Sequence, residues 1–426
     1  MKKIIAVLLS VLMITALAAC SSNSGSVSDT IASYTDAATG NSSGSSETTA
    51  SSGSSGDAVT STANVSSTGA IDASDLFTDR DLRQTADLTD AVYYTVSDGQ
   101  NISITAAGVY VLSGTASNVT VTVDAADDDK VQIVLNGVSI TNSSSPAIYV
   151  KNADKVFVTT ADGTTNTLSV TGTFTADGTT NTDAVIFSKD DLVLNGLGTL
   201  NISSTDNGIS GKDDVKITGG TINITCTSDA IEANDSIAIS DGTITISTRK
   251  DGLHAENDDD NSTGWIYICG GTLDITASSD GIQATTIVQI DGGKITISAS
   301  EGIEGTYVQV NGGEIYITAT DDGINASRKS TSYTVTAEFN DGYVYISMGQ
   351  GDTDGIDSNG NLYVNGGTLD IYGNSPFDYD NIGQYNGGTI IVNGTTTNQL
   401  TNQMMGGGGM GGMGGPGGMG GPGGWH

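Results

Sequence analysis

The chain has 426 residues, of which 49 are Asp or Glu and 15 are Lys or Arg, so its formal net charge at pH 7 is -34. Such a charge makes nucleic acid and anionic membrane surfaces poor partners, and an acidic polymer can bind only if a cation lies between the two. Aromatic residues make up 5% of the chain and 58 residues are Gly, a composition typical of turn-rich β-structure rather than of a helical enzyme.

The first 20 residues predict export. A basic MKK precedes the apolar run IIAVLLSVLMITALAA, and the LAAC run resembles the lipobox of bacterial lipoproteins. We expect residues 1–20 to be a lipoprotein signal peptide and Cys20 to carry the lipid; an ordinary signal peptide with an incidental cysteine is the alternative. No second apolar stretch is long enough to span a bilayer, so attachment at the bacterial cell surface would depend on Cys20 alone.

Low-complexity segments flank the predicted folded domain. Residues 21–75 are rich in Ser, Gly and Thr, with too few large apolar residues to bury, which predicts a disordered tether. Residues 401–426 are rich in Gly and Met and predict a disordered tail, with binding of Cu(I) by the methionines as the alternative.

A repeat of the form Gly-Gly-x-Ile-x-Ile fills the region between them. Copies start at 219, 241, 270, 292, 312, 341, 366 and 387, so successive copies lie 20 to 29 residues apart. Each period also contains a D-G-I piece and an alternating strand such as TIVQI. Three short strands per period, with Ile or Val at alternate positions and Gly at the corners, predict an all-β parallel β-helix of roughly a dozen coils over residues 76–400.

The two cysteines of this region fit the same pattern. Cys226 shares its parity with Ile222 and Ile224 and should point inward, whereas Cys269 has the opposite parity to Ile266 and Ile268. We therefore expect no disulfide between Cys226 and Cys269.

Equivalent residues of successive coils should form columns, and two of the columns are acidic. The first is read as Asp206, Asp229, Asp251, Asp280, Glu301, Asp322 and Asp354, and the second as Ser210, Glu232, His254, Gln283, Glu304, Asn325 and Asp357. Stacked carboxylates repel one another unless a cation neutralises them. We expect one to several Ca²⁺ ions, with candidate ligands Asp229, Glu232, Asp251, Glu256, Asp280, Glu301, Glu304, Asp322, Asp354 and Asp357. The alternative is that each Asp bonds the backbone of its own corner.

Tyrosines mark a second candidate site. Tyr316, Tyr343 and Tyr345 have outward parity in the Gly-Gly strands, with Tyr316 and Tyr345 at equivalent positions of neighbouring coils. Their rings would be placed to stack on sugar rings; ordinary β-propensity is the alternative. Tyr267 and Tyr363 are predicted to face outward from a different strand.

Catalytic groups are sparse. The histidines are His254 and His426, no Ser-His-Asp set is suggested, and no pair of carboxylates stands out as a glycosidase pair. We assign no catalytic residue. If the protein were a polysaccharide lyase, Lys250 would be the candidate base, although a salt-bridge role beside the acidic column explains it equally.

Several segments carry a family resemblance that spans roughly residues 80–400. VQIVLNGVSITNSSSPAIYVKNADKVFVTT, IFSKDDLVLNGLGTLNI, ASEGIEG and DDGINAS, together with the Gly/Met-rich tail, resemble the bacterial carbohydrate-binding domain family of secreted β-helix lipoproteins. The resemblance implies a right-handed parallel β-helix similar to that of pectate lyases. It also implies bound calcium and affinity for plant cell-wall polysaccharide, cellulose-like or pectic, without established lyase activity. The insertions at 257–264 and 328–338 depart from the family and would reshape or cover a binding face.

These observations together predict a monomeric, lipid-anchored protein that binds polysaccharide through a calcium-stabilised β-helix. Nucleic acid is excluded as a partner, and membrane contact is expected only through the lipid. A binding module is favoured over an enzyme. The alternatives are a Ca²⁺-dependent pectate lyase and a structural adhesin with a protein partner.

Overall fold

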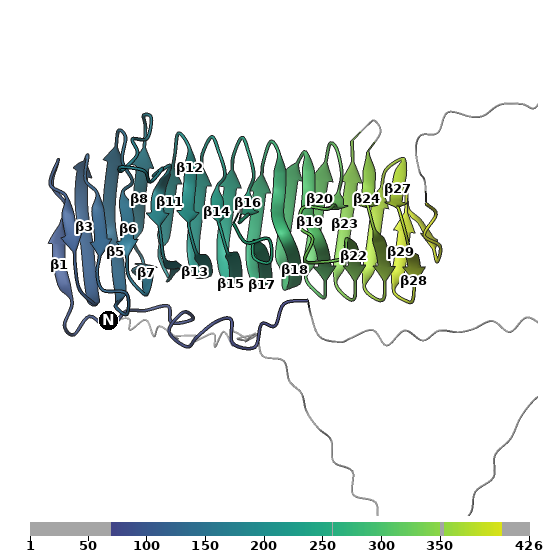
Figure 1. Ribbon diagram of the computed structural model, residues 1–426, viewed down its shortest axis with the longest axis horizontal. Helices are drawn as coiled ribbons and strands as arrows, with labels where there is room; N and C mark the ends of the chain where they lie inside the picture. The colour runs from purple at the N-terminus through teal and green to yellow at the C-terminus, as the bar shows by residue number, and fades with distance from the viewer. Residues whose placement is uncertain (1–69, 258, 350–352, 403–426) are drawn as a thin grey trace, which may run out of the picture.

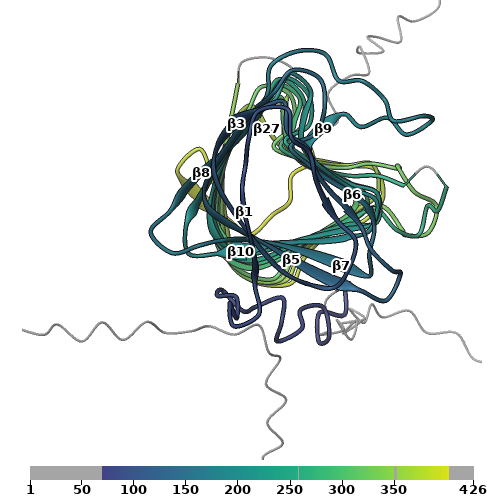
Figure 2. The same cartoon turned by 90° about the vertical axis from the view of Figure 1, so that its left-hand side faces the viewer.

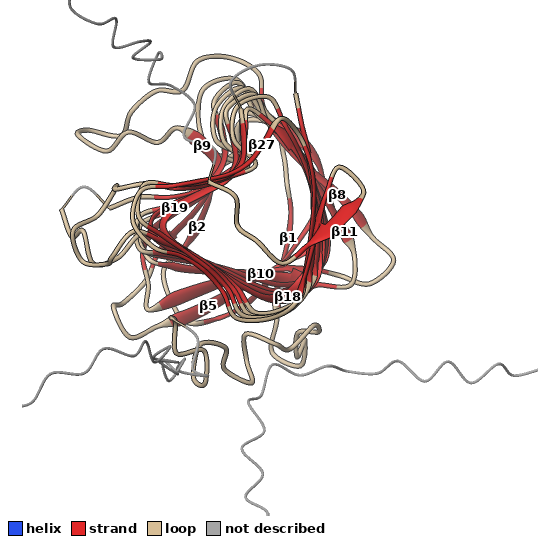
Figure 3. Ribbon diagram, turned by 90° about the vertical axis from the view of Figure 1, so that its right-hand side faces the viewer, coloured by secondary structure: helices blue, strands red, loops and turns tan. Residues whose placement is uncertain are grey.

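The computed structural model describes residues 70–257, 259–349 and 353–402, and every regular element in them is a β-strand (Figures 1 and 3). Cys20, the predicted signal peptide, residues 21–69 of the predicted tether and residues 403–426 lie outside the described residues. The strands stack into a rod whose coils wind clockwise away from a viewer at the N-terminal end (Figure 2). The predicted right-handed parallel β-helix is therefore confirmed. In the described part of the chain, no helix is long and apolar enough to cross a membrane.

The rod has three faces, which we call A, B and C. The strands that lie on face A alone are β1 (Val92–Thr95), β7 (Lys155–Thr160), β10 (Asp191–Gly196), β22 (Thr336–Phe339), β25 (Asn361–Val364) and β28 (Gly383–Tyr385). Those on face B alone are β8 (Thr165–Val170), β11 (Thr199–Ser203), β20 (Glu314–Ala319), β23 (Tyr343–Met348), β26 (Thr368–Tyr372) and β29 (Thr389–Val392). β30 (Thr395–Thr397) pairs antiparallel with β29 at the C-terminal end of the rod.

Face C contains the Asp-Gly-Ile pieces of the repeat. Its short strands are β2 (Ile102–Ile104), β4 (Val121–Asp124), β6 (Ile148–Asn152), β9 (Ala184–Ser188), β12 (Asn207–Gly211), β14 (Ile231–Ala233), β16 (Leu253–Ala255), β21 (Ile324–Ala326), β24 (Asp354–Ser358) and β27 (Ser375–Tyr379). Longer strands turn from one face to the next: β3 (Gly108–Ser117), β5 (Lys130–Asn142), β13 (Asp214–Thr225), β15 (Ser236–Ser247) and β17 (Trp265–Thr276) from A to B, β18 (Asp280–Ala299) from C through A to B, and β19 (Glu301–Val310) from C to A. With β18 and β19, face C has twelve strands, which confirms roughly a dozen coils.

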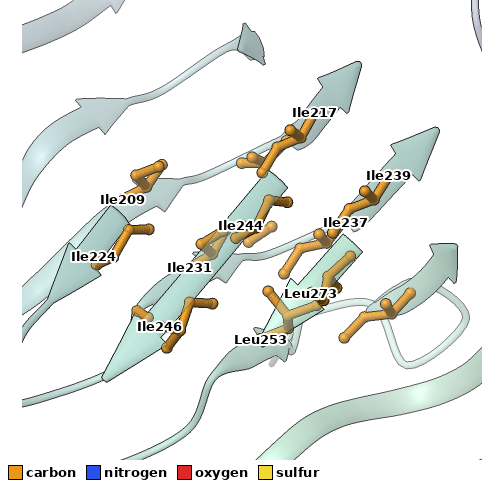
Figure 4. Packing of buried hydrophobic residues seen from close by; sticks show 14 of the residues in the cluster. Ile209, Ile217, Ile224, Ile231, Ile237, Ile239, Ile244, Ile246, Leu253 and Leu273 are labelled. Carbon is orange, nitrogen blue, oxygen red and sulfur yellow. The ribbon is translucent and has the colours of Figure 1, made fainter. Parts of the chain in front are cut away.

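Apolar columns fill the interior of the rod. Ile224 pairs with Ile246 and Ile244 pairs with Leu273, so each side chain stacks on the equivalent residue of the next coil (Figure 4). All four are buried and belong to one continuous hydrophobic core. The alternating Ile and Val positions of the repeat are therefore the core. Cys226 also points inward, as its parity predicts, and its buried thiol is free.

The two glycines of the Gly-Gly phrase make the corner between faces A and B. The second one has a positive φ in each copy; at Gly313, for example, φ is 90° and an added Cβ would lie 2.9 Å from the carbonyl oxygen of Gly293. Glycine adopts this backbone region without the penalty that a side chain imposes. The Gly-Gly phrase therefore recurs once per coil because every coil needs a glycine at this corner.

The glycine of the Asp-Gly-Ile phrase is required for a different reason, which a substitution can test. An added Cβ on Gly302 would lie 2.3 Å from the carbonyl oxygen of Gly323 and 2.5 Å from Cγ2 of Ile317. We expect Gly302→Ala to lower the free energy of unfolding by about 1–3 kcal/mol, because backbone and core must both move. Urea denaturation measures this. Gly305→Ala on the same strand is the control, since its Cβ would meet nothing closer than 3.4 Å; equal midpoints for the two variants would contradict the packing argument.

Residues 70–91, which we call the N-terminal strap, run along the outer side of face A rather than leaving the rod (Figure 1). The backbone N–H of Ala70 donates to Oε1 of Gln309 at 2.8 Å, and Nε2 of Gln84 donates to the carbonyl oxygen of Thr218 at 2.8 Å. The strap therefore crosses several coils at right angles to their strands.

The N-terminal strap buries Tyr267, which was predicted to lie on the surface. Tyr267 has the outward parity that its sequence predicts, yet it is buried, with the Phe77 ring 6.5 Å away and its hydroxyl donating to Oδ2 of Asp291 at 2.8 Å. The prediction of an exposed Tyr267 is wrong because the strap covers this part of face A. Tyr363, farther along the rod, is half-buried.

Candidate functional site

The acidic columns of face C form as predicted, with one shift in phase. Asp280 pairs with Glu301. Pairing of the Ile or Leu two residues further on places Asp229, Asp251, Asp322 and Asp354 in the same column. Asp206 does not belong to it: because Ile209 pairs with Ile231, the residue opposite Asp229 is Asn207. The second column contains Ser210, Glu232, His254, Gln283, Glu304, Asn325 and Asp357, as predicted.

Three of the six carboxylates of the first column accept a hydrogen bond from the backbone of the neighbouring coil. The N–H of Asp251 donates to Oδ1 of Asp229 at 3.0 Å, that of Asp280 to Oδ1 of Asp251 at 2.9 Å, and that of Asp354 to Oδ1 of Asp322 at 3.1 Å. These bonds run between coils, whereas the corner alternative placed them within each residue's own turn. Hydrogen bonds of this column therefore link successive coils without a bound ion.

The series of backbone hydrogen bonds is interrupted at residues 298–305, SASEGIEG. Three carboxylates lie close together there. One oxygen each of Asp280, Glu301 and Glu304 lies within 4.8 Å of the others, and Asp280 and Glu304 are buried. We call this set the carboxylate triad. Burial and the charge of Glu304 raise the pKa of Glu301 to about 7, and burial with the charges of Asp251 and Glu301 raises that of Asp280. The site therefore gathers more negative charge than its surroundings stabilise.

The neighbours of the carboxylate triad compensate only part of this charge. Nζ of Lys329 lies 2.7 Å from Oε2 of Glu304, and Nδ2 of Asn325 donates to Oε2 of Glu301 at 3.0 Å. Oδ1 of Asn325 is buried and has no hydrogen-bond partner among the described residues. Hard carboxylate and amide oxygens of this kind are the ligands that Ca²⁺ prefers.

A second cluster, around Asp229, is already neutralised by side chains. Nζ of Lys250 lies 2.7 Å from Oδ2 of Asp229, and Nδ1 of His254 lies 3.4 Å from the same oxygen. Burial alone would raise the pKa of Asp229, but the hydrogen bonds from His254 and Lys250 outweigh it and lower the pKa. Nε2 of His254 also lies 3.2 Å from Oε2 of Glu256. Oδ2 of Asp251 lies 3.8 Å from Nδ1 of the same histidine. Asp229, Asp251 and Glu256 are thus paired with basic side chains, and they need no metal ion to compensate their charge.

The remaining predicted ligands lie along the same edge without joining the carboxylate triad. Glu232 accepts hydrogen bonds from Asn207 at 2.8 Å and Ser210 at 3.1 Å. Farther along, burial and the charges of Asp322 and Asp378 raise the pKa of Asp357 to about 7, so the end of the column is also short of positive charge.

A third acidic cluster was not predicted as a site. Carboxylate oxygens of Asp191, Asp213 and Asp214 lie within 4.8 Å of one another where face C turns into face A. Burial and the charge of Asp191 raise the pKa of Asp213. Asp191 and Asp214 occupy equivalent positions of adjacent coils, and alignment of DLVL with DVKI would have revealed the pair.

The predicted tyrosines lie together on the outer side of face B. Tyr316 pairs with Tyr345 on the next coil, and their ring centroids are 6.2 Å apart. Tyr343 lies 5.8 Å from Tyr316 on one side. Tyr372, which the sequence reasoning missed, lies 5.6 Å from Tyr345 on the other and is 39% exposed. These four residues, which we call the tyrosine strip, connect three successive coils. Tyr372 ends its GGTLDIY copy at the outward position, and this parity would have identified it.

The family model of carbohydrate-binding domain-containing proteins matches residues 98–353. A carbohydrate-binding domain-containing protein of Acetivibrio thermocellus is 37% identical over 157 residues, which is 36% of this chain and 53% of that relative. The chain thus spans about half the length of the curated relative that it matches.

Among solved structures, the chain is similar to a polysaccharide lyase-like protein from C. thermocellum, determined as a gadolinium derivative. The TM-score is 0.46 and the sequence identity 29%, over 53% of this chain and 93% of that protein. Because the family model covers more than half of the sequence, the chain belongs to the family of carbohydrate-binding domain-containing proteins.

Proposed function

We propose that the protein is a lipid-anchored module that binds plant cell-wall polysaccharide along the tyrosine strip of face B. The observation that carries this proposal is the series Tyr343, Tyr316, Tyr345 and Tyr372, with successive ring centroids 5.8, 6.2 and 5.6 Å apart across three coils. Family membership supports carbohydrate as the ligand.

The strip suits a polymer better than a single sugar. Coils repeat at about 4.8 Å, and Tyr316 and Tyr345 lie at equivalent positions of adjacent coils, while Tyr372, opposite Ser347, continues the strip diagonally on the third coil. A polysaccharide that crosses the three coils diagonally would therefore contact Tyr316, Tyr345 and Tyr372 in turn. Outward-facing Thr318 and Ser347, on the same strands, supply hydroxyl groups for hydrogen bonds with sugar hydroxyls. Nζ of Lys294 lies 5.8 Å from the Tyr316 ring centroid and offers one cation at the edge.

The carboxylate triad is the part of face C that we propose to hold calcium. Asp280, Glu301 and Glu304 supply carboxylate oxygens, and Oδ1 of Asn325 offers a neutral oxygen beside them. A bound Ca²⁺ would neutralise this edge and could bridge to the carboxylates of galacturonate. Such a bridge would let a protein of net charge -34 bind an acidic polymer.

A glycan-binding screen in calcium that also monitors product release tests the function as a whole. We expect binding to pectic or cellulose-like polymers without release of unsaturated products. Adhesion to cells in the absence of any glycan binding would favour the adhesin alternative and contradict our proposal.

Lyase activity is not favoured by the environment of its candidate base. Burial alone would lower the pKa of Lys250, but its hydrogen bond to Asp229 and the charges of Asp229 and Asp251 outweigh burial and raise the pKa. A lysine held protonated in this way is a poor proton acceptor at neutral pH. Unsaturated product that disappears in Lys250→Ala would overturn this view.

Anchoring through Cys20 is the proposed link to the cell surface. We expect Cys20→Ser to move the protein from the membrane fraction to the soluble fraction, because no lipid could then be attached. Fractionation and immunoblotting measure the change, with Cys226→Ser as the control because that thiol is buried in the rod. Membrane retention of Cys20→Ser would contradict a lipid anchor at this residue.

A further inference from the structure

A groove of about 480 Å³ opens on face A, away from the tyrosine strip. Its lining includes Tyr307 from β19, Glu338 from β22, Asn361 and Tyr363 from β25, and Tyr333 from the segment before β22. The volume falls within the range of small-ligand sites, about 300–1,000 Å³. Aromatic rings combined with hydroxyl, amide and carboxylate groups form a surface that offers both stacking and hydrogen bonding.

The groove is held in shape by contacts between the two sequence insertions. Oγ of Ser330 donates to the carbonyl oxygen of Asn261 at 2.6 Å, and the N–H of Ser330 donates to Oγ1 of Thr306 at 2.8 Å. Asn261 belongs to the insertion at 257–264, and Ser330 to the insertion at 328–338. The first insertion therefore braces the second, which carries Tyr333. Instead of covering a binding face, the second insertion builds one wall of the groove.

The base of the groove is fixed by a buried carboxylate. Glu338 is 8% exposed, and its Oε2 accepts hydrogen bonds from the Tyr307 hydroxyl and from Nε2 of Gln309. Its Oε1 accepts from Nδ2 of Asn365 at 3.1 Å. Burial and the hydrogen bond to Glu338 raise the pKa of Tyr307, which keeps this phenol protonated as a donor. The ring of Tyr307 is therefore held in place before a ligand arrives.

Charge decides which class of sugar this groove can accept. The hydrogen-bond partners of Glu338 are a tyrosine, a glutamine and an asparagine, all neutral. None of the described residues that line the groove is Lys or Arg. A uronate would bring a second negative charge towards Glu338 with no cation to compensate it, whereas an uncharged sugar meets no such penalty.

The N-terminal strap leaves this part of face A open. Within the described residues, the strap reaches the rod at Gln309, where the N–H of Ala70 donates to Oε1, and runs from there towards the N-terminal coils. The groove lies on the other side of that contact, over β22 and β25.

We propose that this groove binds a short stretch of an uncharged oligosaccharide and discriminates against uronates. The inference rests on the proposed polysaccharide-binding function and adds a second site, on a different face and with a different charge preference from the calcium-bridged pectate site. The two faces would let one molecule hold a neutral and an acidic glycan at once.

The test uses the full chain with cellohexaose and xylohexaose as neutral probes and hexagalacturonate as the anionic probe. Binding is measured by calorimetry, and contacts by oxidative footprinting of individual tyrosines. We expect a neutral probe to protect Tyr333 and Tyr363 from oxidation, and hexagalacturonate to leave both unprotected. Tyr333→Ala and Tyr363→Ala should each weaken neutral binding about tenfold. Tyr93→Ala, which removes a 64% exposed tyrosine on β1 at the other end of the rod, is the control and should bind like the wild type. Unchanged thermal melting shows that each variant is folded.

The possible failures are distinguishable. If a neutral probe binds but protects only the tyrosine strip, or if Tyr333→Ala and Tyr363→Ala bind it like the wild type, the groove is not the site, while the proposed function stands. Equal protection of the groove by hexagalacturonate would overturn the charge preference and with it the inference. If neither neutral probe binds, the inference also fails, and the polysaccharide screen decides separately whether the proposed function fails with it.

Discussion

Removing calcium with EDTA is expected to lower the melting temperature of the protein by about 4–6 °C and to abolish its binding to pectate. A ligand present at 100 to 1,000 times its Kd stabilises the folded state by about 3–4 kcal/mol, which corresponds to such a shift in a domain of this size. The physical reason is the carboxylate triad, where Asp280, Glu301 and Glu304 lie close together with Lys329 as their paired cation. Differential scanning calorimetry and a pectate pull-down measure the two effects.

The same cluster predicts how stability depends on pH. Glu301 has a pKa of about 7 in the folded protein, above its ordinary value of 4.5, and the pKa of Asp280 is also raised. The folded state therefore binds more protons than the unfolded state between about pH 4.5 and 7. The calcium-free protein should lose stability as pH rises through this interval. Because calcium must displace these protons, the stabilisation that it provides should grow over the same interval.

A single substitution separates calcium binding from unspecific effects of EDTA. Glu304→Gln removes one carboxylate and leaves the corner residue Glu301 intact, so it should make the melting temperature nearly insensitive to calcium. Asp128→Asn, at an exposed position far from the carboxylate triad in the sequence, is the control and should respond like the wild type. A calcium-independent melting temperature and unchanged pectate binding in the wild type would refute the calcium proposal.

Loss of the central pair of the tyrosine strip should have the other large effect. The double variant Tyr316→Ala/Tyr345→Ala removes two stacked rings on neighbouring coils, and we expect polysaccharide binding to weaken about 10- to 100-fold. Both side chains face outward from the core, so the melting temperature should change little. Affinity electrophoresis in gels that contain the polymer measures the loss.

Two controls show whether stacking is responsible. Tyr316→Phe/Tyr345→Phe keeps the rings and should retain most of the affinity. Tyr93→Ala removes a tyrosine that is 64% exposed on β1, at the other end of the rod, and should bind like the wild type. If the alanine pair binds as tightly as the wild type, face B is not the binding face.

The fold was predictable because every coil needs the same residue types at the same positions of the repeat. Ile and Val must recur to stack in the core, and glycine must recur where backbones meet, as at Gly302 and Gly313. Aligning the repeat on the core isoleucine also determines the acidic column. Asp206 was misplaced because its DNGI copy has one residue more between Asp and Ile than the DGI copies, so that Asn207 takes the column position.

Features that depend on non-repeating segments could not be predicted in the same way. Tyr267 follows the parity rule but is covered by Phe77, nearly 200 residues earlier in the chain. The groove requires a contact between Asn261 and Ser330, which belong to separate insertions with no periodic relation. Parity determines whether a side chain points away from the core; only the tertiary structure determines what lies over it.

The N-terminal strap gives the rod a mechanical property. A pull on the chain at Ala70 acts on the flank of the rod, beside Gln309, and not on its first strand. The hydrogen bonds of the strap would then break in order along the chain, first at Gln309, next at Gln289 and later at Thr218. Peeling the strap in this order releases about 70 Å of chain before any load reaches β1. The N-terminal strap would thus act as an extensible segment that lengthens under load while every coil stays folded.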